Sequence, residues 1–406
     1  MLVTGGGGFI ASHLIETLVL CGARVRAFVR YNSRGDPGLL SLLPAPIFQE
    51  VEIVAGDLRD LTAVEAAVKN VSHIFHLGAL IADFAGLTGI EASTVEAAGA
   101  SGGAALRQAY LAVVAGAADV ALVVGIEKMT DRTGSSVEAA ITTTVDGDFE
   151  GVQGLTPTAQ AALLMRRYMH EFGVAHECFA GFPLVAHANG ESNPNAMFRK
   201  AISAETYRRA GMVSDPLNMF DVAPNADGAA ALLLTRAELL PAGFPRPLVR
   251  ISGSSMVTDT LALHDRSDPL AFRAARLSVE RACRQAGILP TDVDLLELYD
   301  AYSIFAALSL EAAGFSGRGQ AWQLAQDGDA HPLRLSLLGS LPISTFGGLK
   351  ARGNPGGATG VYQAVEATLQ LRGLAGKNQV PGAQRALVQC LGGPASSAVT
   401  HVIEVV

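Results

Sequence analysis

The chain has 406 residues and a net charge of −8, and 49% of its residues are hydrophobic while 17% are charged. Long disordered tracts are excluded, because they need low hydrophobicity and high net charge. The acidic balance argues against nucleic acid as a partner, because phosphate binding draws on Lys and Arg. The length allows two or three domains.

Membrane and metal signals are also missing from the sequence. The chain opens on an apolar strand pattern without a basic leader, and no apolar stretch reaches about 18 residues. Its four cysteines form neither a CxxC motif nor a Cys/His cluster, so we predict no zinc site and no disulfide scaffold. We therefore expect a cytoplasmic protein with no membrane span and no metal centre.

Strand and helix patterns alternate through the first eighty residues. This alternation implies a parallel sheet covered by helices. The stretch 31–46 is rich in Gly, Pro and Ser and predicts a surface loop. The expected elements, in chain order, are strands at 2–4, 24–29, 52–54 and 73–76 and helices at 9–20 and 61–68.

A second series of elements begins at residue 79. The run 120–127 is continuously apolar, which is typical of a strand buried on both faces. The polar stretch 130–156 reads as an inserted excursion. The other expected helices are 102–115, 159–172, 272–287, 304–313 and 359–371, and the other expected strands are 93–96, 225–235, 249–253, 295–298, 342–348, 386–391 and 400–405.

The first strand and helix flank a Gly-rich turn, LVTGGGGFIASHL, with Gly5, Gly8 and Ala11 at dinucleotide-site spacing. Glycines there let the backbone approach a phosphate, and the helix N-terminus presents free N–H groups. With GDLRD and IFHLGA, this segment resembles the extended short-chain dehydrogenase family of nucleotide-sugar epimerases and dehydratases. The resemblance implies that Asp57 lies beside the adenine. Arg30, at the end of the second strand, favours NADP over NAD.

The catalytic pair of that family, a Tyr four residues before a Lys, is absent, because none of the seven tyrosines has a Lys at that spacing. The strand pattern also stops near the fourth strand, so the sugar-binding half is missing. We expect weak NAD(P) binding without hydride transfer. The alternatives are a remnant of a nucleotide-sugar epimerase or dehydratase, and glycines that only close a turn.

Five motifs follow one another in the rest of the chain. They are VEAAGASGGAAL (95–106), DVAPNADGAAALLLT (221–235), YDAYS (299–303), GGLKARGNPGGATG (347–360) and CLGG (390–393). Together they resemble the thiolase superfamily, in particular the sterol-carrier-protein thiolases and the archaeal thiolase-like proteins. The resemblance covers about four-fifths of the chain, but the elements that normally precede the nucleophile are replaced by the dinucleotide segment.

We therefore expect an α/β chain with a partial Rossmann βαβ unit followed by an incomplete thiolase-type layered αβαβα core. The predicted domains are residues 1–78, an N-terminal thiolase half at 79–250 and a C-terminal half at 251–406. The change-over falls around residues 76–83. A natural fusion, a recombination product and a hybrid created by sequence assembly all fit this pattern.

Thiolase chemistry needs a thiolate nucleophile, a His that activates it, a second Cys and backbone N–H groups for the oxyanion. The resemblance places the nucleophile at Gly99, which has no side chain, and the His at Asn354, which cannot take a proton near neutral pH. Cys390 occupies the place of the second Cys. Asp300 lies in the loop that helps to build the oxyanion hole in sterol-carrier relatives.

These positions also have structural interpretations. Cys390 could be a packed core thiol, and Asp300 and Tyr302 could cap the helix that begins near Ser303. Ser101 is an alternative nucleophile, but it has no identifiable activating base.

The predicted function is that of a thiolase-like acyl-CoA acyltransferase of the acetyl-CoA acetyltransferase family, catalytically impaired, with a coenzyme A thioester as its substrate. The alternative from another class is a non-catalytic thiolase-like subunit or acyl-CoA binder. In both cases acyl-CoA is the small-molecule partner. We expect a homo-oligomer, or a complex with another thiolase-like or accessory subunit.

Overall fold

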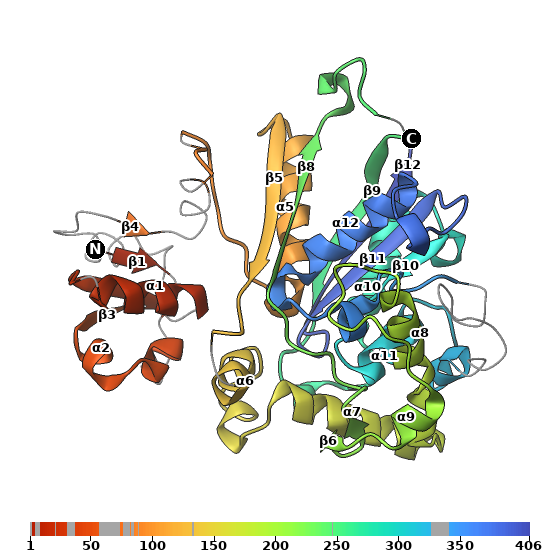
Figure 1. Ribbon diagram of the computed structural model, residues 1–406, viewed down its shortest axis with the longest axis horizontal. Helices are drawn as coiled ribbons and strands as arrows, with labels where there is room; N and C mark the ends of the chain where they lie inside the picture. Colours follow the sequence, from red (N-terminus) through yellow and green to blue (C-terminus); the bar gives the residue numbers. More distant parts are fainter. Residues whose placement is uncertain are drawn as a thin grey trace. The chain divides into compact units, whose positions relative to one another are not determined.

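The structure is a computed structural model that describes residues 2–4, 9–20, 22–30, 37–56, 74–75, 82, 85–87, 89–131, 134–245, 247–325 and 341–406. The chain forms two compact units (Figure 1). The first contains Met1–Val95 and Thr133–Thr143, and the second contains Glu96–Arg132 and Thr144–Val406.

The first unit is built on a parallel sheet with the strand order β3-β2-β1-β4. Its elements are β1 (Leu2–Thr4), α1 (Phe9–Leu20), β2 (Val25–Arg30), α2 (Ala45–Gln49), β3 (Val51–Gly56), β4 (Ile74–Phe75) and α6 (Gly134–Thr142). Val3, Ile15 and Ala27 are buried in one apolar cluster between the sheet and α1. The predicted βα alternation of this unit is confirmed for the described elements.

One prediction for the first unit is wrong in part. The stretch expected to be a loop contains a 3-10 turn (Gly38–Leu42) and the start of α2. Leu40 is fully buried in the core of the unit. Apolar contacts therefore organise a segment whose Gly and Pro content predicted none. The predicted helix at 61–68 lies outside the described residues.

The second unit is layered. A mixed four-stranded sheet of order β10-β11-β12-β9 and an antiparallel pair β5-β8 enclose the helices α5 and α12 between them. Helix α10 covers the other face of the larger sheet, and α11 contacts α10 (Figure 1). These elements are α5 (Ser101–Val114), β5 (Val120–Glu127), β8 (Gly228–Thr235), β9 (Val249–Thr258), α10 (Arg273–Ala286), β10 (Leu295–Glu297), α11 (Ser303–Ala312), α12 (Thr359–Leu371), β11 (Arg385–Gly392) and β12 (Ser397–Val405).

The long connection between β5 and β8 contains most of the remaining elements of the second unit. They are α7 (Pro157–Phe172), α8 (Gly181–Gly190), α9 (Ala204–Arg208), β6 (Met212–Ser214) and β7 (Leu217–Asn218). Thr156 caps α7, because its side chain accepts a hydrogen bond from Ala159 N. Gly173, in the left-handed conformation, ends the helix. The expected α/β class with a layered core is confirmed.

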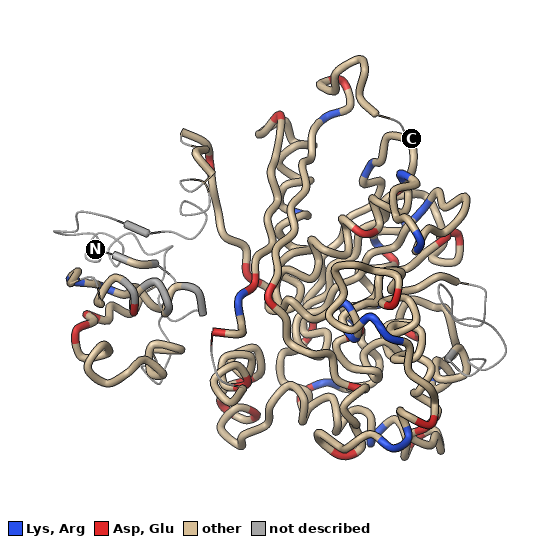
Figure 2. Tube along the Cα trace, viewed as in Figure 1, with Lys and Arg blue, Asp and Glu red and all other residues tan. Residues whose placement is uncertain are grey.

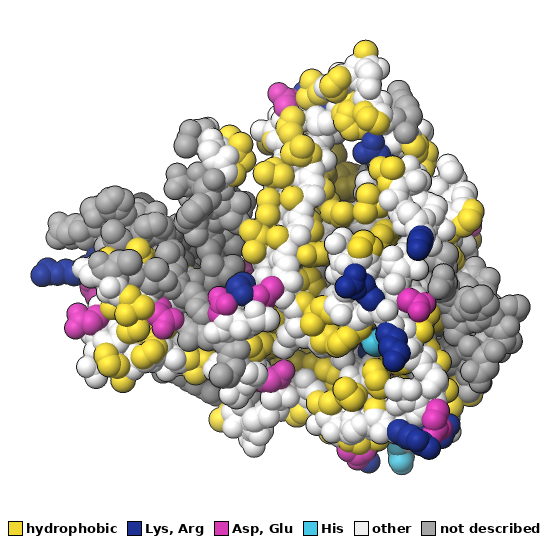
Figure 3. All heavy atoms as spheres, viewed as in Figure 1, with side chains coloured by type: hydrophobic (Ala, Val, Ile, Leu, Met, Phe, Trp, Pro, Cys, Tyr) yellow, Lys and Arg dark blue, Asp and Glu magenta, His cyan; other side chains and the backbone are white. Residues whose placement is uncertain are grey.

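The pair β5-β8 differs from the expectation of a strand buried on both faces. Its inner face packs on α5 and α12, where Val123 is buried. The outer face carries Val120, Leu122 and Leu233, which are 57%, 45% and 69% exposed. Figure 3 shows hydrophobic side chains along this sheet. Within the described part of the second unit no helix covers this outer face. Only the inner face of the two apolar strands is therefore buried there.

Two predicted strands are absent from the structure. Residues 93–96 make no sheet, and the Glu96 carboxylate instead accepts a hydrogen bond from Ala98 N. In the stretch 342–348, one bridge joins Ile343 to Leu296. The chain then turns at Gly347 and Gly348, whose φ angles are +106° and +54°. These left-handed conformations end an extended strand, and glycine adopts them at no steric cost.

Candidate functional site

The first turns of α5 and α12 lie against each other because both carry glycines. A Cβ atom on Gly102 would lie 2.8 Å from Val361 N, and one on Gly360 would lie 2.8 Å from Gly103 Cα. Only glycine allows such a close approach of two backbones. The free N–H groups and positive dipole ends of two helices therefore meet in one region, which favours a negatively charged or polarised oxygen.

Gly99 lies immediately before α5, in the 3-10 turn Ala98–Ala100. A Cβ atom built on Gly99 would overlap the Tyr299 hydroxyl and would lie 2.6 Å from Leu391 O and 2.7 Å from Tyr299 Cζ. The Tyr299 side chain thus fills the space that a side chain at position 99 would need.

Tyr299 follows β10 and is 8% exposed. Burial raises the pKa of its hydroxyl above the ordinary range, and nearby Tyr302, Cys390 and Asp300 act in the same direction. The hydroxyl is therefore protonated at neutral pH and can donate a hydrogen bond. Tyr299 is the first residue of the motif YDAYS, and nothing in the sequence predicted a role for it.

Cys390 lies on β11 beneath the first turn of α5. It is completely buried, with Sγ 3.9 Å from Ala100 O, and a Cβ on Gly103 would overlap this sulfur. Burial raises the pKa of the thiol to about 12. At neutral pH Cys390 is a neutral thiol, which is a weak nucleophile and a weak base.

Asn354 is held in a loop by its own backbone and side chain. Its N–H donates to Pro224 O at 2.8 Å, and its carbonyl oxygen accepts from Ala226 N at 3.0 Å. Its Oδ1 accepts a hydrogen bond from Gly356 N at 3.2 Å. The following residue, Gly357, lies against Ser101 at the start of α5. The side chain of Asn354 therefore braces the turn that leads into α12.

Asp300 is buried, and its Oδ1 accepts a hydrogen bond from Leu349 N at 2.8 Å. Burial raises the pKa of this carboxyl, while the positive charge of Lys350 acts in the opposite direction. Asp300 thus fixes the turn Gly348–Arg352. The alternative that Asp300 or Tyr302 caps α11 is wrong, because Tyr302 at the N-cap makes no side-chain cap bond.

Lys350 is buried, and the sequence did not predict it as a site residue. Its ammonium group donates to the main-chain oxygens of Asp221 at 2.7 Å and Phe220 at 3.3 Å. Burial lowers its pKa to about 8, and the charges of Asp300 and Asp221 oppose this. Lys350 therefore joins the turn Gly348–Arg352 to the loop at Phe220 and Asp221, and its only sequence signal was its place within GGLKARGNPGGATG.

Ser101 forms the start of α5. Its Oγ accepts a hydrogen bond from Ala97 N at 2.8 Å and lies 2.6 Å from Ala98 O and 2.9 Å from Glu96 Oε1. These contacts support a structural role in the turn rather than a role as a nucleophile.

The dinucleotide positions are described only in part. Ala11 is fully buried on α1, and Arg30 is the last residue of β2 and pairs with Gly56 of β3. Gly5, Gly8 and Asp57 lie outside the described residues.

The described residues show neither a metal-binding cluster nor a helix that could span a membrane. Within that part of the chain, no three His, Cys, Asp or Glu side chains are grouped so that they could hold a metal ion. No helix there has both the length and the apolar character needed to cross a bilayer.

Comparisons with protein families agree with the layered fold. Residues 65–238 match the N-terminal domain of thiolase, residues 255–405 match the thiolase C-terminal domain-like family, and residues 2–82 match GDP-mannose 4,6 dehydratase. The N-terminal fragment is therefore Rossmann-like in sequence, and the thiolase match covers most of the remainder.

Individual relatives lead to the same assignment. The chain is 39% identical over 327 residues to an acetyl-CoA acetyltransferase of Methanothermobacter thermautotrophicus, covering 80% of this chain and 83% of that protein. It is 31% identical to the 17-hydroxy-3-oxo-4-pregnene-20-carboxyl-CoA lyase of Mycobacterium tuberculosis over 73% of this chain and 77% of the lyase. The solved Ltp2-ChsH2(DUF35) aldolase superposes with a TM-score of 0.68 at 25% identity, covering 80% of this chain and 83% of that one. The chain therefore belongs to the thiolase-like acetyl-CoA acetyltransferase family.

Proposed function

We propose that this protein binds acyl-CoA thioesters and does not form a covalent acyl-enzyme. The observation that carries the proposal is the Tyr299 hydroxyl in the space of the nucleophile side chain at Gly99. Thioester exchange through an enzyme nucleophile requires a thiolate or an activated hydroxyl with a base beside it. Neither Gly99 nor Asn354 supplies such a group.

The neighbouring residues do not replace the missing groups. The buried thiol of Cys390 is protonated at neutral pH because its pKa is raised to about 12. The hydroxyl of Ser101 is occupied by the turn before α5. What remains is a binding frame made of two helix N-termini and a buried phenolic hydroxyl, which suits a polar thioester carbonyl.

Calorimetry with acetyl-CoA, combined with intact-mass measurement, tests this proposal. We expect saturable binding and no gain of an acetyl group in mass. Ser101→Ala should leave both results unchanged. A stoichiometric acetyl adduct that disappears in Ser101→Ala, or in Cys390→Ala, would show that the chain has another nucleophile.

A second candidate is cleavage of a carbon–carbon bond without a covalent intermediate. It is favoured by Tyr299 and by two relatives whose names are those of a CoA lyase and an aldolase. In such a reaction a 3-hydroxyacyl-CoA loses its hydroxyl proton to a base and its Cα–Cβ bond breaks. The electron pair passes to the thioester as an enolate, which is then protonated at Cα. The protonated Tyr299 hydroxyl is the group that could stabilise or protonate this enolate.

The assay for the second candidate uses 3-hydroxybutanoyl-CoA, which would give acetaldehyde and acetyl-CoA. Tyr299→Phe should abolish product formation while acetyl-CoA binding persists. If the unmodified protein forms neither product, the second candidate is overturned, and only the proposed binding of acyl-CoA stands.

The expected cofactor, oligomeric state, partners and location of the protein remain proposals. The N-terminal unit is proposed to bind NAD(P) weakly, without hydride transfer. A non-catalytic subunit stays an alternative, as do a homo-oligomer and a complex with a thiolase-like or accessory subunit. Basic and acidic residues are interspersed along the second unit (Figure 2). That nucleic acid is not a partner stays a prediction from the net charge. A cytoplasmic location also stays a prediction.

A further inference from the structure

Five buried charged side chains lie around the turn Gly348–Arg352. They come from β10 and the residues after it, from the turn itself and from α12, and they are Glu297, Asp300, Lys350, Arg352 and Glu366. Three are carboxyls and two are cations, so full ionisation would leave one negative charge in excess. An uncompensated charge in a protein interior is costly, and a carboxyl in that position takes up a proton instead.

Asp300 already has compensating partners. Its Oδ1 accepts a hydrogen bond from Leu349 N at 2.8 Å, and the positive charge of Lys350 favours its ionised form. The carboxyl that holds the proton is therefore one of the other two, Glu297 or Glu366.

Glu297 and Glu366, the carboxyl pair, share one guanidinium. Arg352 Nε lies 3.2 Å from Glu366 Oε1, and the positive charge of Arg352 also acts on Glu297. Glu297 Oε1 accepts hydrogen bonds from the N–H and the hydroxyl of Thr345, at 3.1 Å and 2.8 Å. Glu366 Oε2 has no hydrogen-bond donor among the described residues, and a proton on the carboxyl pair would supply one. Burial raises the pKa of both carboxyls, and the negative charge of Glu366 raises that of Glu297 further, so the pair titrates as a unit.

The other titratable groups near the turn are neutral or have partners of their own. Burial lowers the pKa of His187 to about 4 and raises the pKa of Cys390 to about 12, so both are neutral at pH 7. The hydroxyl of Tyr299 keeps its proton because burial raises its pKa. The carboxylate of Asp221, whose charge acts on Lys350, is held by His176, Tyr207 and Asn218. The excess charge therefore stays with the carboxyl pair.

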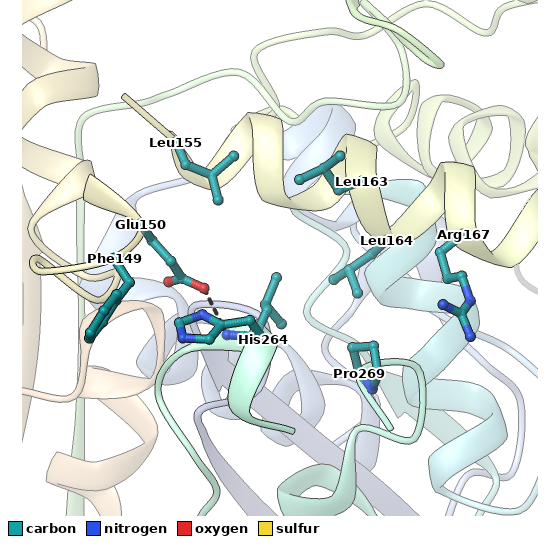
Figure 4. A pocket seen from close by; sticks show the side chains of 9 residues that line it. Phe149, Glu150, Leu155, Leu163, Leu164, Arg167, His264 and Pro269 are labelled. Atoms are coloured by element: carbon teal, nitrogen blue, oxygen red, sulfur yellow. Dashed lines mark hydrogen bonds between the residues drawn. The ribbon is translucent and has the colours of Figure 1, made fainter. Parts of the chain in front are cut away.

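Burial of a carboxylate by itself does not create such a shortage of partners. Glu150 is also buried, at a depression between α7 and the loop that follows β9 (Figure 4). Its oxygens accept hydrogen bonds from Leu263 N at 2.7 Å, from Gln160 Nε2 at 2.7 Å and from Asp146 N at 3.1 Å. The shortage at the carboxyl pair arises because two carboxyls meet one guanidinium.

The turn Gly348–Arg352 is a single π-helical turn between two glycines with positive φ angles, Gly347 at +106° and Gly353 at +114°. Turns of this kind occur frequently at functional sites. The ion pair of Arg352 with Glu366 joins the end of the turn to α12, whose first residues belong to the binding frame. A change in charge at the carboxyl pair therefore acts on the elements that would hold the thioester carbonyl.

We propose that one proton held by the carboxyl pair keeps Arg352 paired with Glu366 and so holds the turn Gly348–Arg352 in the conformation that binds acyl-CoA. This inference rests on the proposed function and adds its regulation, because binding becomes coupled to a proton. When the proton leaves, two carboxylates face one guanidinium, and hydration of the excess charge loosens the turn. The affinity for acyl-CoA therefore falls as the pH rises through the range in which the carboxyl pair loses its proton.

The experiment is calorimetry with acetyl-CoA on the full chain at about pH 6 and about pH 9, comparing the unmodified chain with Glu297→Gln. Gln at this position keeps an oxygen for the donors of Thr345 and cannot ionise, so it mimics the protonated pair. Loss of one proton changes an equilibrium by up to about tenfold per pH unit, and we expect the affinity of the unmodified chain to fall at least about fivefold more than that of Glu297→Gln. The titration of Lys350 and of the CoA phosphates is common to both proteins. Glu280→Gln, at an exposed position of α10, is the matched control and should behave as the unmodified chain.

Infrared spectra of the free protein give a second measurement that does not depend on acyl-CoA. The unmodified chain should show a carbonyl band of a protonated carboxyl that disappears as the pH rises, and Glu297→Gln should lack this band. If acetyl-CoA binds at neither pH, the proposed function fails, and the proton coupling fails with it. If acetyl-CoA binds with the same pH dependence in the unmodified chain and in Glu297→Gln, or if no such band titrates, only the proton coupling is overturned.

Discussion

Because Tyr299 contacts Gly99, adding a single methyl group at position 99 should lower the unfolding free energy by a large amount. In Gly99→Ala the new Cβ would meet the Tyr299 hydroxyl, with Tyr299 Cζ at 2.7 Å and Leu391 O at 2.6 Å. Overpacking a well-packed site costs about 1–3 kcal/mol. Leu391 lies within β11 and is paired with Ala398 of β12, so its carbonyl cannot easily move aside. We therefore expect the upper part of this range, about 2–3 kcal/mol of lost unfolding free energy.

Urea denaturation followed by the fluorescence of Trp322 measures this loss, because Trp322 is the one tryptophan of the chain and lies in the second unit. A loss of about 2 kcal/mol lowers the midpoint by roughly 1 M at a slope of about 2 kcal/mol/M. Gly211→Ala is the control, since nothing lies within 4 Å of a Cβ at that exposed position. It should change the unfolding free energy by less than about 0.5 kcal/mol.

A double-mutant cycle identifies the source of the cost. Tyr299→Leu removes the hydroxyl and Cζ, so Gly99→Ala in that background should cost at least about 1 kcal/mol less. An equal cost in both backgrounds, or a Gly99→Ala variant as stable as Gly211→Ala, would refute the claim that Tyr299 occupies the space of a side chain at position 99.

Three further predictions concern other parts of the chain. Burial lowers the pKa of Lys350 to about 8, whereas its pKa in the unfolded chain is about 10.4. Between these two pH values the unfolded state therefore binds a proton that the folded state has lost. The unfolding free energy should therefore rise from about pH 8 to pH 10 and should rise less in Lys350→Met; equal slopes in urea titrations would contradict this. Leu122→Asp with Leu233→Asp places charges on the apolar outer face of β5-β8 and should convert the predicted homo-oligomer into monomers in light scattering; an unchanged mass would show that subunits meet elsewhere. Calorimetry of the full chain with NAD and NADP should give dissociation constants weaker than micromolar; sub-micromolar affinity for either cofactor would show a complete dinucleotide site.

Much of the fold could be predicted because the signals are local. The observed bounds of β1 (Leu2–Thr4), α1 (Phe9–Leu20), β5 (Val120–Glu127) and α12 (Thr359–Leu371) are those expected from periodicity and flanking glycines. The predicted strand at 342–348 failed because side-chain pattern does not report the left-handed backbone of Gly347 and Gly348. Apolar residues at such a position pack without forming a strand.

What the sequence by itself determined is the fold class, the order of the motifs, and the absence of a thiol at position 99 and of an imidazole at position 354. Only the tertiary structure decided what fills the vacant space, because Tyr299 reaches Gly99 from a loop 200 residues further along the chain. The burial of Lys350, which lowers its pKa, arises in the same way from contacts with residues about 130 positions earlier in the chain, Phe220 and Asp221. Which face of the pair β5-β8 is exposed depends on which helices pack against it in the folded protein. The apolar pattern of the strand does not tell whether one face or both are covered. Properties that depend on contacts distant in sequence are therefore decided by packing, while helix and strand bounds follow from neighbouring residues.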